Sequence, residues 1–351
     1  MTKRFIPATN LDGGTPIGSS YLATFVRCPY LFFNQYIRPA GDLEDGGMLV
    51  GIQPRFRSSA LSSGSMFHTF MEHLYLSGCR DGHDTGEWDI DAALNAMAVC
   101  REEVRSGYQE TTDCDKDFDA MMLLGRQYVD EFGRQSHSGT PEWPRFQVAF
   151  DGEGRPLIER EFRLELGYND YYITSKPDII MTRDGYLITR DHKTAAKSWG
   201  ARRANNIDTD PQFTMEHMIL SELFPEEAFA GSEVNVVVKG LNLGTKAQRF
   251  YRNTTTRSIS DIISFKADTL DLLHRIDESV ANFTDLLEST GDLELSAGLA
   301  FPRHGVRTDA CHAFNRNCDF IDLCLYKDNI NNNLGAFKPR RVARMDEQIE
   351  D

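Results

Sequence analysis

The chain has 351 residues and a net charge of −15 at pH 7, and 40% of its residues are hydrophobic while 26% are charged. This balance is typical of a folded globular protein and excludes an intrinsically disordered chain. No run approaches the roughly 18 apolar residues of a membrane span, and the N-terminus lacks the apolar core of a signal peptide. We therefore expect a cytoplasmic protein with no membrane association.

Helical periodicity dominates the first 150 residues. Ser19-Ser20 offers an N-cap to an apolar segment that Cys28-Pro29 interrupts, which predicts a kinked helix or two short helices with the proline opening the second. Segments 89–110 and 117–136 are amphipathic and predict two further helices. Gly139–Pro144 is predicted to be a linker. We therefore expect an N-terminal helical region over residues 1–150.

Another helix in this region is predicted from Gly64. Four apolar side chains then recur at helical spacing: Phe67, Phe70, Met71 and Leu74. His68 shares a face that adjoins this apolar stripe. A lone histidine on a helix is usually structural, so a ligand role for His68 needs support from other residues.

Strand patterns begin after residue 150. The predicted strands are 157–166, 171–181, 186–189, 233–241 and 247–254. A helix over Pro211–Phe224, capped by Asp210, separates the third strand from the fourth, and a long helix follows over Ser258–Ser289. A hairpin, a crossover helix and further strands indicate an α/β fold with a mixed central sheet flanked by helices, with its core over residues 151–290.

The hairpin around Asp184-Gly185 carries the candidate chemistry. An Asp-Gly pair between two strand runs is a strong hairpin signal, and pairing of the runs brings Asp178 close to Asp191. Lys193 lies on the same face as Asp191, because side chains alternate along a strand. Two carboxylates repel each other unless one is protonated or a cation lies between them, and a hard divalent metal is the simplest resolution. Alternatively, the aspartates flank a turn and Lys193 is a solvated strand end.

Basic residues are concentrated after this hairpin, although the chain as a whole is acidic. They are Arg190, Lys193, Lys197, Arg202, Arg203, Lys239, Lys246, Arg249, Arg252 and Arg257. We expect a basic site on an acidic body, with a solvated mixed-charge face as the alternative for any single residue. The sequence has no GxxxxGK[ST] phosphate loop and no kinase or Rossmann glycine pattern, which argues against nucleotide hydrolysis.

The chain contains seven cysteines, an odd number, and no secretory signal, so a disulfide framework is not indicated. Cys311, Cys318 and Cys324 are concentrated near the C-terminus, and Cys28 stands alone near the N-terminus. From the residues alone, these four are buried thiols or a zinc site. The remaining three are expected to be buried thiols: Cys79, Cys100 and Cys114.

The order of these motifs resembles the RecB-like branch of the PD-(D/E)XK nuclease superfamily. The motifs are the Cys-Pro-bearing helix (Ser20–Ile37), Gly64-x-x-x-His68, Lys176-Pro177-Asp178, Asp191-His192-Lys193-Thr194 and a helix that opens with Gln212. Each motif is weak by itself, but the five in the family's order span nearly the whole chain. The resemblance implies a sheet of the restriction-endonuclease-like type and metal-dependent cleavage of phosphodiester bonds.

The resemblance also implies roles for the site residues. The implied ligands of Mg²⁺ or Mn²⁺ are His68, Asp178, Asp191 and the backbone carbonyl of His192. Lys193 would orient or deprotonate the attacking water and hold the scissile phosphate, and Gln212 would support the lysine and the substrate backbone.

One position of this site departs from the family. The family often has a tyrosine four residues after the glutamine, whereas this chain has Glu216, which is expected to add negative charge near DNA. Glu161, on the predicted strand 157–166, is either an extra carboxylate of the site or a solvated strand residue.

The cysteines give a second point of resemblance. Cys318 and Cys324 have the C-x5-C spacing of AddB-like and CRISPR-adaptation nucleases, which carry a C-terminal [4Fe–4S] cluster. Cys28 and Cys311 complete four thiolates, although the six residues between Cys311 and Cys318 exceed the family's usual spacing. Zn²⁺ at the same cysteines is the alternative. The cluster would staple a segment over residues 291–330 to the helix that carries Cys28.

Together, these features predict a metal-dependent deoxyribonuclease. The resemblance implies an exonuclease that acts on single-stranded or unwound DNA ends in recombination, repair or phage DNA metabolism, with a helicase or recombination protein as partner. The alternative is a catalytically inactive DNA-binding or scaffold subunit of a larger DNA-processing complex. The polar residues 331–351 are expected to form a disordered tail.

Overall fold

The computed structural model describes residues 15–40, 48–49, 51–56, 59–105, 108, 111–134, 141–169, 171–196, 205–225, 229–239, 249–304, 310–312, 317–325 and 333–340. Contacts divide the chain into two compact units, and both are discontinuous in sequence. The first comprises Met1–Arg55, Arg163–Thr174 and Ile263–Asp351, and the second comprises Phe56–Phe162 and Ser175–Ile262. The helices expected in the region 1–150 are therefore shared between the two units.

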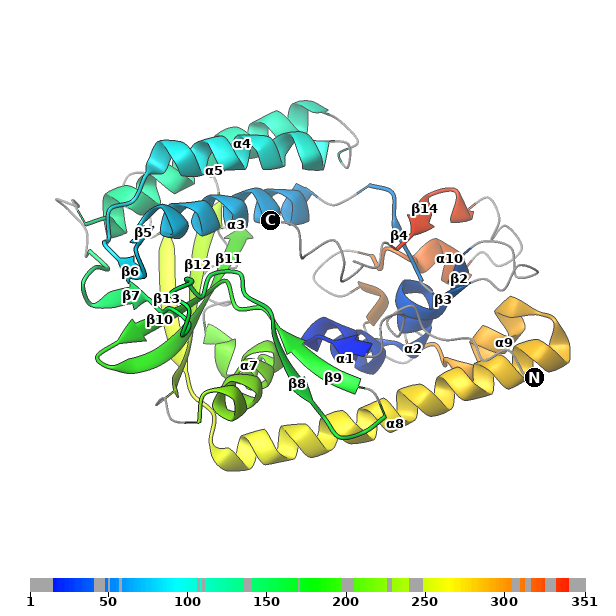
Figure 1. Ribbon diagram of the computed structural model, residues 1–351. Coiled ribbons are helices and arrows are strands. Elements are labelled where there is room, and N and C mark those ends of the chain that lie inside the picture. Colours follow the sequence, from blue (N-terminus) through cyan, green and yellow to red (C-terminus); the bar gives the residue numbers. More distant parts are fainter. Residues whose placement is uncertain are drawn as a thin grey trace. The chain divides into compact units, whose positions relative to one another are not determined.

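The second unit is built on a mixed sheet of five strands (Figure 1). In spatial order they are β13 (Phe250–Thr255), β12 (Phe229–Lys239), β11 (Tyr186–Ala196), β10 (Ile179–Arg183) and β7 (Phe146–Val148). β11 and β12 pair in parallel, and the other neighbours pair antiparallel. A parallel pair needs a crossover, which here contains α7 (Pro211–Leu223). This arrangement confirms the expected α/β fold with a mixed central sheet flanked by helices.

Helices cover both faces of this sheet, with α3 (Ser59–Ser77) and α5 (Thr111–Phe132) on one face and α7 on the other (Figure 1). α4 (Ile90–Arg105) packs against α3 and α5. The predicted apolar stripe of α3 is buried in the largest core cluster. α3 begins five residues before the predicted start, and its first turn contains Ala60 and Leu61, both strong helix formers.

The Asp184-Gly185 hairpin forms as predicted. Arg183 pairs with Tyr186, and both turn residues have positive φ, 52° for Asp184 and 84° for Gly185, as a two-residue type I′ turn requires. The predicted strand 171–181 is in fact two strands, β9 (Tyr171–Ser175) and β10, with Lys176-Pro177-Asp178 between them. A proline cannot donate a hydrogen bond to a sheet ladder, which explains the interruption.

Short elements complete the second unit. β5 (Cys79–Arg80) and β6 (His83–Asp84) form a small hairpin after α3. A single 3₁₀ turn (Ile207–Thr209) precedes α7. Asp210 caps α7, since its Oδ1 accepts from the backbone N–H of Gln212 at 3.0 Å, as the sequence predicts.

The first unit contains the predicted pair of short N-terminal helices. They are α1 (Ser19–Arg27) and α2 (Pro29–Phe32), and the proline is the first residue of α2. A π-helical turn (Phe33–Ile37) follows. Aromatic rings of Phe32, Phe33, Phe283 and Phe301 pack together and join this segment to the helices that follow residue 263.

The remaining elements of the first unit come from distant parts of the sequence. The helices are α8 (Ile259–Thr290), whose first four residues belong to the second unit, α9 (Leu293–Ala300) and α10 (Ile321–Leu325). A sheet joins β1 (Thr15–Ile17), β9 and β8 (Phe162–Glu165), and β2 (Pro39–Ala40) pairs with β3 (Met48–Leu49).

No helix in the described part of the chain is long and apolar enough to cross a membrane.

The segment expected to be a disordered tail, 331–351, is described over residues 333–340. There β14 (Phe337–Pro339) pairs antiparallel with β4 (Ile52–Pro54), and the ring of Phe337 stacks on Phe320. These eight residues thus differ from the expectation, because the segment contributes an aromatic side chain to a small core. The rest of the predicted tail lies outside the described residues.

Candidate active site

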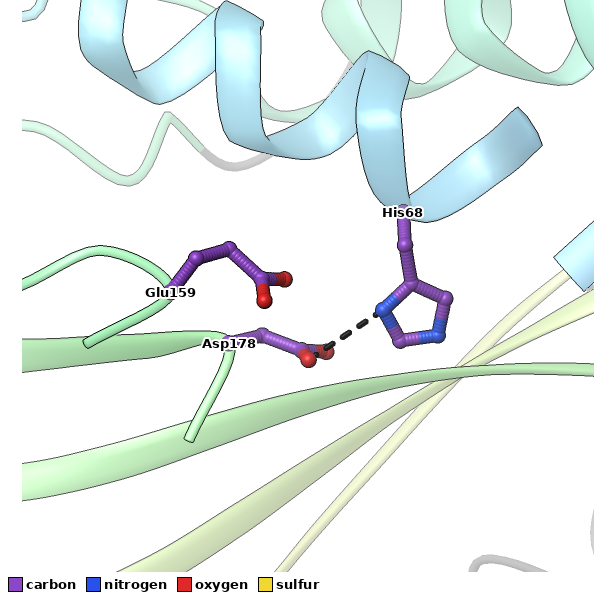
Figure 2. Close-up of side chains that lie close together, drawn as sticks. All are labelled: His68, Glu159 and Asp178. Atoms are coloured by element: carbon purple, nitrogen blue, oxygen red, sulfur yellow. Dashed lines mark ion pairs between the residues drawn. The ribbon is translucent and has the colours of Figure 1, made fainter. Parts of the chain in front are cut away.

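Three side chains of the second unit converge near the start of β10 (Figure 2). His68 comes from α3, Asp178 from the residue before β10, and Glu159 from the connection that precedes β8. Their ligand atoms all lie within 4.8 Å of one another, and His68 Nδ1 is 3.1 Å from Asp178 Oδ1. One imidazole and two carboxylates form a mixed N and O donor set, which suits Mn²⁺ or Mg²⁺.

Asp178 is held in a charged state by its surroundings. It is 8% exposed, and Oδ2 accepts the backbone N–H of His192 at 2.5 Å. Burial alone would raise the pKa of Asp178. Neighbouring groups, His68 first among them, outweigh burial and lower this pKa to about 2. Burial would likewise lower the pKa of His68, whereas Asp178 and then Asp191 raise it above its ordinary value. The site therefore favours a positive charge beside the Asp178 carboxylate.

Sequence reasoning missed Glu159 and considered Glu161 instead. The predicted strand 157–166 is regular only from Phe162, because Glu159 has a positive φ of 50° and the chain turns there. The Glu159 N–H donates to the carbonyl of Asp178 at 2.9 Å, which fixes it beside the site, while Glu161 is exposed. Burial and then Asp178 raise the pKa of Glu159, and its Oε2 lies 2.9 Å from the ammonium of Lys176.

Asp191, Lys193 and Gln212 form an adjoining group. Lys193 Nζ lies 2.6 Å from Asp191 Oδ2, and the Gln212 side chain joins both, with Nε2 donating to Asp191 Oδ1 at 2.9 Å and Oε1 accepting from Lys193 at 3.3 Å. Asp191 is 2% exposed, and burial is the largest of the effects that raise its pKa. The structure thus places Asp191 against Lys193 and Gln212, while Asp178 lies against His68 and Glu159.

Glu216 differs from the sequence expectation. It is 0% exposed, so its carboxyl does not add charge to the protein surface. Its Oε1 accepts from Gln212 Nε2 at 3.0 Å and its Oε2 accepts from Thr189 Oγ1 at 2.9 Å. Burial and then Asp191 raise the pKa of Glu216 to about 8. The helix face that carries Gln212 and Glu216 is turned toward β11.

The side chain of His192 points to the opposite face of the sheet. Its Nδ1 lies 2.8 Å from Asn235 Nδ2, and its ring packs beside Tyr75 and Tyr128. Burial lowers its pKa to about 3, so the imidazole is neutral. The backbone behaves differently: the N–H of His192 faces Asp178, and in a strand the carbonyl of the same residue points to the same side. This geometry directs the carbonyl, rather than the imidazole, toward the convergent carboxylates.

The sequence model of the PD-(D/E)XK nuclease superfamily matches residues 17–325 of this chain. The match covers most of the chain and includes every polar residue of the site. The chain belongs to this superfamily. A search of curated proteins found no match. Membership indicates a nuclease that depends on a divalent metal such as Mg²⁺ or Mn²⁺, and the five-stranded mixed sheet is consistent with the restriction-endonuclease-like fold of the superfamily.

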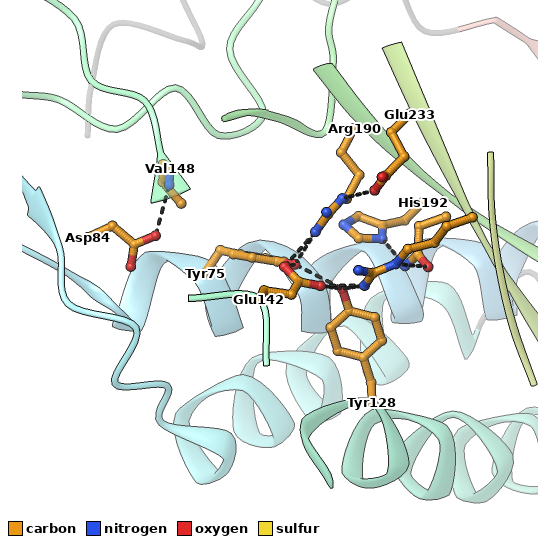
Figure 3. A network of polar contacts seen from close by, with 10 residues as sticks. Tyr75, Asp84, Tyr128, Glu142, Val148, Arg190, His192 and Glu233 are labelled. Carbon is orange, nitrogen blue, oxygen red and sulfur yellow. Dashed lines mark hydrogen bonds and ion pairs between the residues drawn. The ribbon is translucent and has the colours of Figure 1, made fainter. Parts of the chain in front are cut away.

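The second unit also contains a buried network of charged and phenolic side chains (Figure 3). Glu142 lies at the centre of this network and is 2% exposed. It accepts hydrogen bonds from the hydroxyls of Tyr75 and Tyr128, each at 2.8 Å. Arg190 Nη1 lies 2.5 Å from Glu142 Oε2, and the guanidinium of Arg252 contacts Oε1. The predicted linker Gly139–Pro144 therefore supplies a core residue, which its composition did not indicate.

Three of the ten residues expected to form a basic site have bonding partners inside the protein. Arg190 is 0% exposed and its Nε is 2.7 Å from Glu233, so its charge is satisfied inside the protein. Arg252 faces Glu142, and Arg257 bonds to Thr214 and to backbone carbonyls around α7. These arginines are structural. Four of the other predicted basic residues, Lys197, Arg202, Arg203 and Lys246, lie outside the described residues.

The four cysteines singled out by spacing line one cavity of about 290 Å³ in the first unit. Cys28 precedes α2, Cys324 lies in α10, and the N–H of Cys318 donates to the carbonyl of Cys311 at 2.7 Å. All four thiols have intermediate exposure. Of the other three, Cys100 and Cys114 are buried as expected, whereas Cys79 is only partly buried.

Proposed function

We propose that this chain is an exonuclease of the RecB-like branch that degrades single-stranded or unwound DNA from its ends. The observation that supports catalysis is the position of Lys193, which is ion-paired with Asp191 beside the His68, Glu159 and Asp178 group. An inactive scaffold would have no need of an ammonium and three buried or half-buried carboxylates in one place, because such groups are costly to desolvate.

The proposed metal ligands are His68, Asp178, Asp191, the carbonyl of His192 and, from the structure, Glu159. A bound divalent cation would offset charge on the phosphate and lower the pKa of an attacking water. The protein itself preorganises the donors: the N–H of His192 fixes one oxygen of Asp178, and the N–H of Glu159 fixes the turn that carries the second carboxylate.

Lys193 is the proposed catalytic lysine, and Gln212 positions it. The carboxylate of Asp191 and the amide oxygen of Gln212 hold the ammonium at a defined point on the α7 face of β11. From there the ammonium can orient an attacking water and hold the scissile phosphate, whereas deprotonation of the water would need Lys193 as the neutral amine. End-directed action, the preference for single strands and a helicase or recombination partner rest on the resemblance to the RecB-like branch.

The variant Lys193→Ala is expected to lower cleavage about 10²-fold to 10⁴-fold, because it removes a group that acts on the attacking water. The measurement is degradation of single strands labelled at the 5′ or the 3′ end, with Mg²⁺ or Mn²⁺ and with a chelator as blank. Lys116→Ala removes an exposed lysine of α5 and is the matched control. Circular single strands separate end-directed from internal cleavage.

Two results would contradict this proposal. If the wild-type protein and Lys193→Ala degrade every labelled strand equally slowly, the chain is the inactive DNA-binding or scaffold subunit. If the wild-type protein cleaves circular and linear strands at the same rate, it is a nuclease but not an exonuclease.

We also propose that Cys28, Cys311, Cys318 and Cys324 hold a [4Fe–4S] cluster. Four thiols around one cavity match the number of thiolates that such a cluster takes. Arg27 at the end of α1 donates to the carbonyl of Ala310 at 2.8 Å, so the helix before Cys28 is tied to the turn that carries Cys311. The cluster would add covalent links among three distant segments of the first unit, a structural role.

Anaerobic purification is expected to give a brown protein with about four iron atoms per chain, and Cys324→Ser is expected to lose most of that iron. Cys79→Ser, which changes a partly buried thiol of the second unit, is the control and should keep it. A colourless protein with stoichiometric zinc would instead establish the Cys₄ zinc site.

A further inference from the structure

We propose that Glu216 is a positioning residue of the nuclease site, which acts through Gln212 to set the orientation of Lys193 and Asp191. The inference rests on the proposed nuclease function. Glu216 occupies the position at which the family often has a tyrosine. Its contacts indicate how it can position the neighbouring residues.

The Gln212 side chain has two possible orientations, related by rotation of its amide group. In the observed one, Nε2 donates to Asp191 and Oε1 accepts from Lys193. Rotation by half a turn would place the amide nitrogen against the ammonium and the amide oxygen against the carboxylate. Both contacts would then be unfavourable, since two donors and two acceptors would face each other.

Glu216 adds a further contact that favours the observed orientation. It lies four residues after Gln212 on α7, so the two side chains share one face of the helix. Its Oε1 accepts a second hydrogen bond from Gln212 Nε2 at 3.0 Å, on the nitrogen that also donates to Asp191. The glutamine nitrogen is thus held between two carboxyl groups, which leaves its oxygen for Lys193.

The second carboxyl oxygen of Glu216 is bonded to side chains of the sheet. Oε2 accepts from Thr189 Oγ1 at 2.9 Å and from Ser232 Oγ at 3.4 Å, and these two hydroxyls are 2.7 Å apart. Thr189 lies two residues before Asp191 on β11, so the same network reaches the strand that carries the active-site residues. A fully buried carboxyl bonded to neutral partners costs free energy that an apolar side chain would not, which points to a role beyond packing.

The test compares three substitutions at position 216 in the full-length protein with Mn²⁺ and labelled single-stranded DNA. Glu216→Leu is expected to lower kcat about tenfold to hundredfold while KM changes little, because a misplaced lysine slows the reaction without removing a DNA contact. Glu216→Gln, which can still accept from Gln212, is expected to retain most of the activity. Glu216→Asp keeps a carboxyl but withdraws it from Gln212, so it should resemble Glu216→Leu and serves if the leucine variant does not fold.

Controls separate positioning from packing. Glu222→Leu makes the same change on an exposed position of α7 and should leave kcat unchanged. In a Gln212→Ala background, Glu216→Leu is expected to have no further effect on kcat, since the residue through which it acts is gone. If the double variant instead loses kcat by the product of the two single losses, Glu216 acts through general packing. That result overturns the inference.

Failure of the inference is distinct from failure of the proposed function. If the wild-type protein cleaves DNA and Lys193→Ala does not, but folded Glu216→Leu and Glu216→Asp match the wild type, then the inference alone is wrong. If the wild-type protein shows no metal-dependent cleavage, the proposed function is wrong and the inference falls with it.

Discussion

Asp178→Asn is expected to reduce metal-dependent DNA cleavage about 10³-fold or more. A bound divalent metal contributes several kcal/mol of transition-state stabilisation, and each 1.4 kcal/mol corresponds to about a factor of ten in rate. Asp178 contacts His68 through one oxygen and the N–H of His192 through the other, and Glu159 lies beside both. An amide in its place carries no charge to attract a cation, so the proposed site loses its central ligand.

The substitution should nevertheless leave the protein folded. The amide oxygen of an asparagine can accept the His192 N–H, which is 2.5 Å from Asp178 Oδ2 in the wild type. Its amide group fills nearly the same volume as the carboxylate, so the buried position is not emptied. We therefore expect the free energy of unfolding to change far less than the rate of cleavage.

The measurements are the cleavage rate and the affinity for Mn²⁺, by calorimetry, for each variant. Asp184→Asn is the matched control, because it makes the same chemical change in the exposed turn of the same hairpin, and asparagine tolerates the positive φ found there. Asp184→Asn should match the wild type in both measurements. If Asp178→Asn binds Mn²⁺ and cleaves DNA as well as Asp184→Asn does, Asp178 is not a metal ligand.

The largest expected effect on stability comes from Glu142→Gln. We expect a loss of about 3–5 kcal/mol in the free energy of unfolding, because the change leaves Arg190 and Arg252 facing an uncharged group in a buried site. Only one of Tyr75 and Tyr128 could still donate its hydroxyl proton to residue 142, because the amide nitrogen of glutamine is not an acceptor. Urea denaturation at pH 7 measures the loss, and Glu102→Gln, in an exposed ion pair with Arg101, should cause no measurable change.

The same carboxylate makes stability depend on pH. Burial would raise the pKa of Glu142, but Arg190, Arg252 and the two tyrosine hydroxyls lower it well below its usual range. Because the pKa is lower in the folded state, the stabilisation is fully present above the unfolded-state pKa of about 4.3 and is lost as the pH falls toward the folded-state value. Between pH 7 and pH 3, the wild type should therefore lose more stability than Glu142→Gln. Parallel losses in the two proteins would show that Glu142 is not the responsible group.

Local signals in the sequence predicted the elements that carry the site. The Asp-Gly turn predicted the β10–β11 hairpin because it needs positive φ at both residues, and Asp210 predicted the start of α7 because it can cap the helix. The alternation of side chains predicted that Lys193 lies beside Asp191. These features depend on residues close together in the chain, and the structure has them.

Residues whose roles depend on long-range contacts were not predicted. Glu142 lies in a segment with the composition of a linker, and its burial arises only because α3, α5, β11 and β13 bring Tyr75, Tyr128, Arg190 and Arg252 around it. The strand pattern of residues 157–166 does not indicate Glu159 as a site residue, because alternation of side chains cannot show that one residue has a positive φ. From the sequence, Glu216 is expected to add negative charge near DNA, but the side chain is fully buried.

By itself, the sequence determined the α/β class, the hairpin, the crossover helix and the order of motifs that identifies the superfamily, because periodicity, turn chemistry and spacing are properties of the chain. Only the tertiary structure decided which carboxylates meet, which arginines are buried, and that Asp191 faces Lys193 and Gln212 while Asp178 faces His68. Burial and proximity decide a side chain's charge and partners, and both arise only when distant segments pack together.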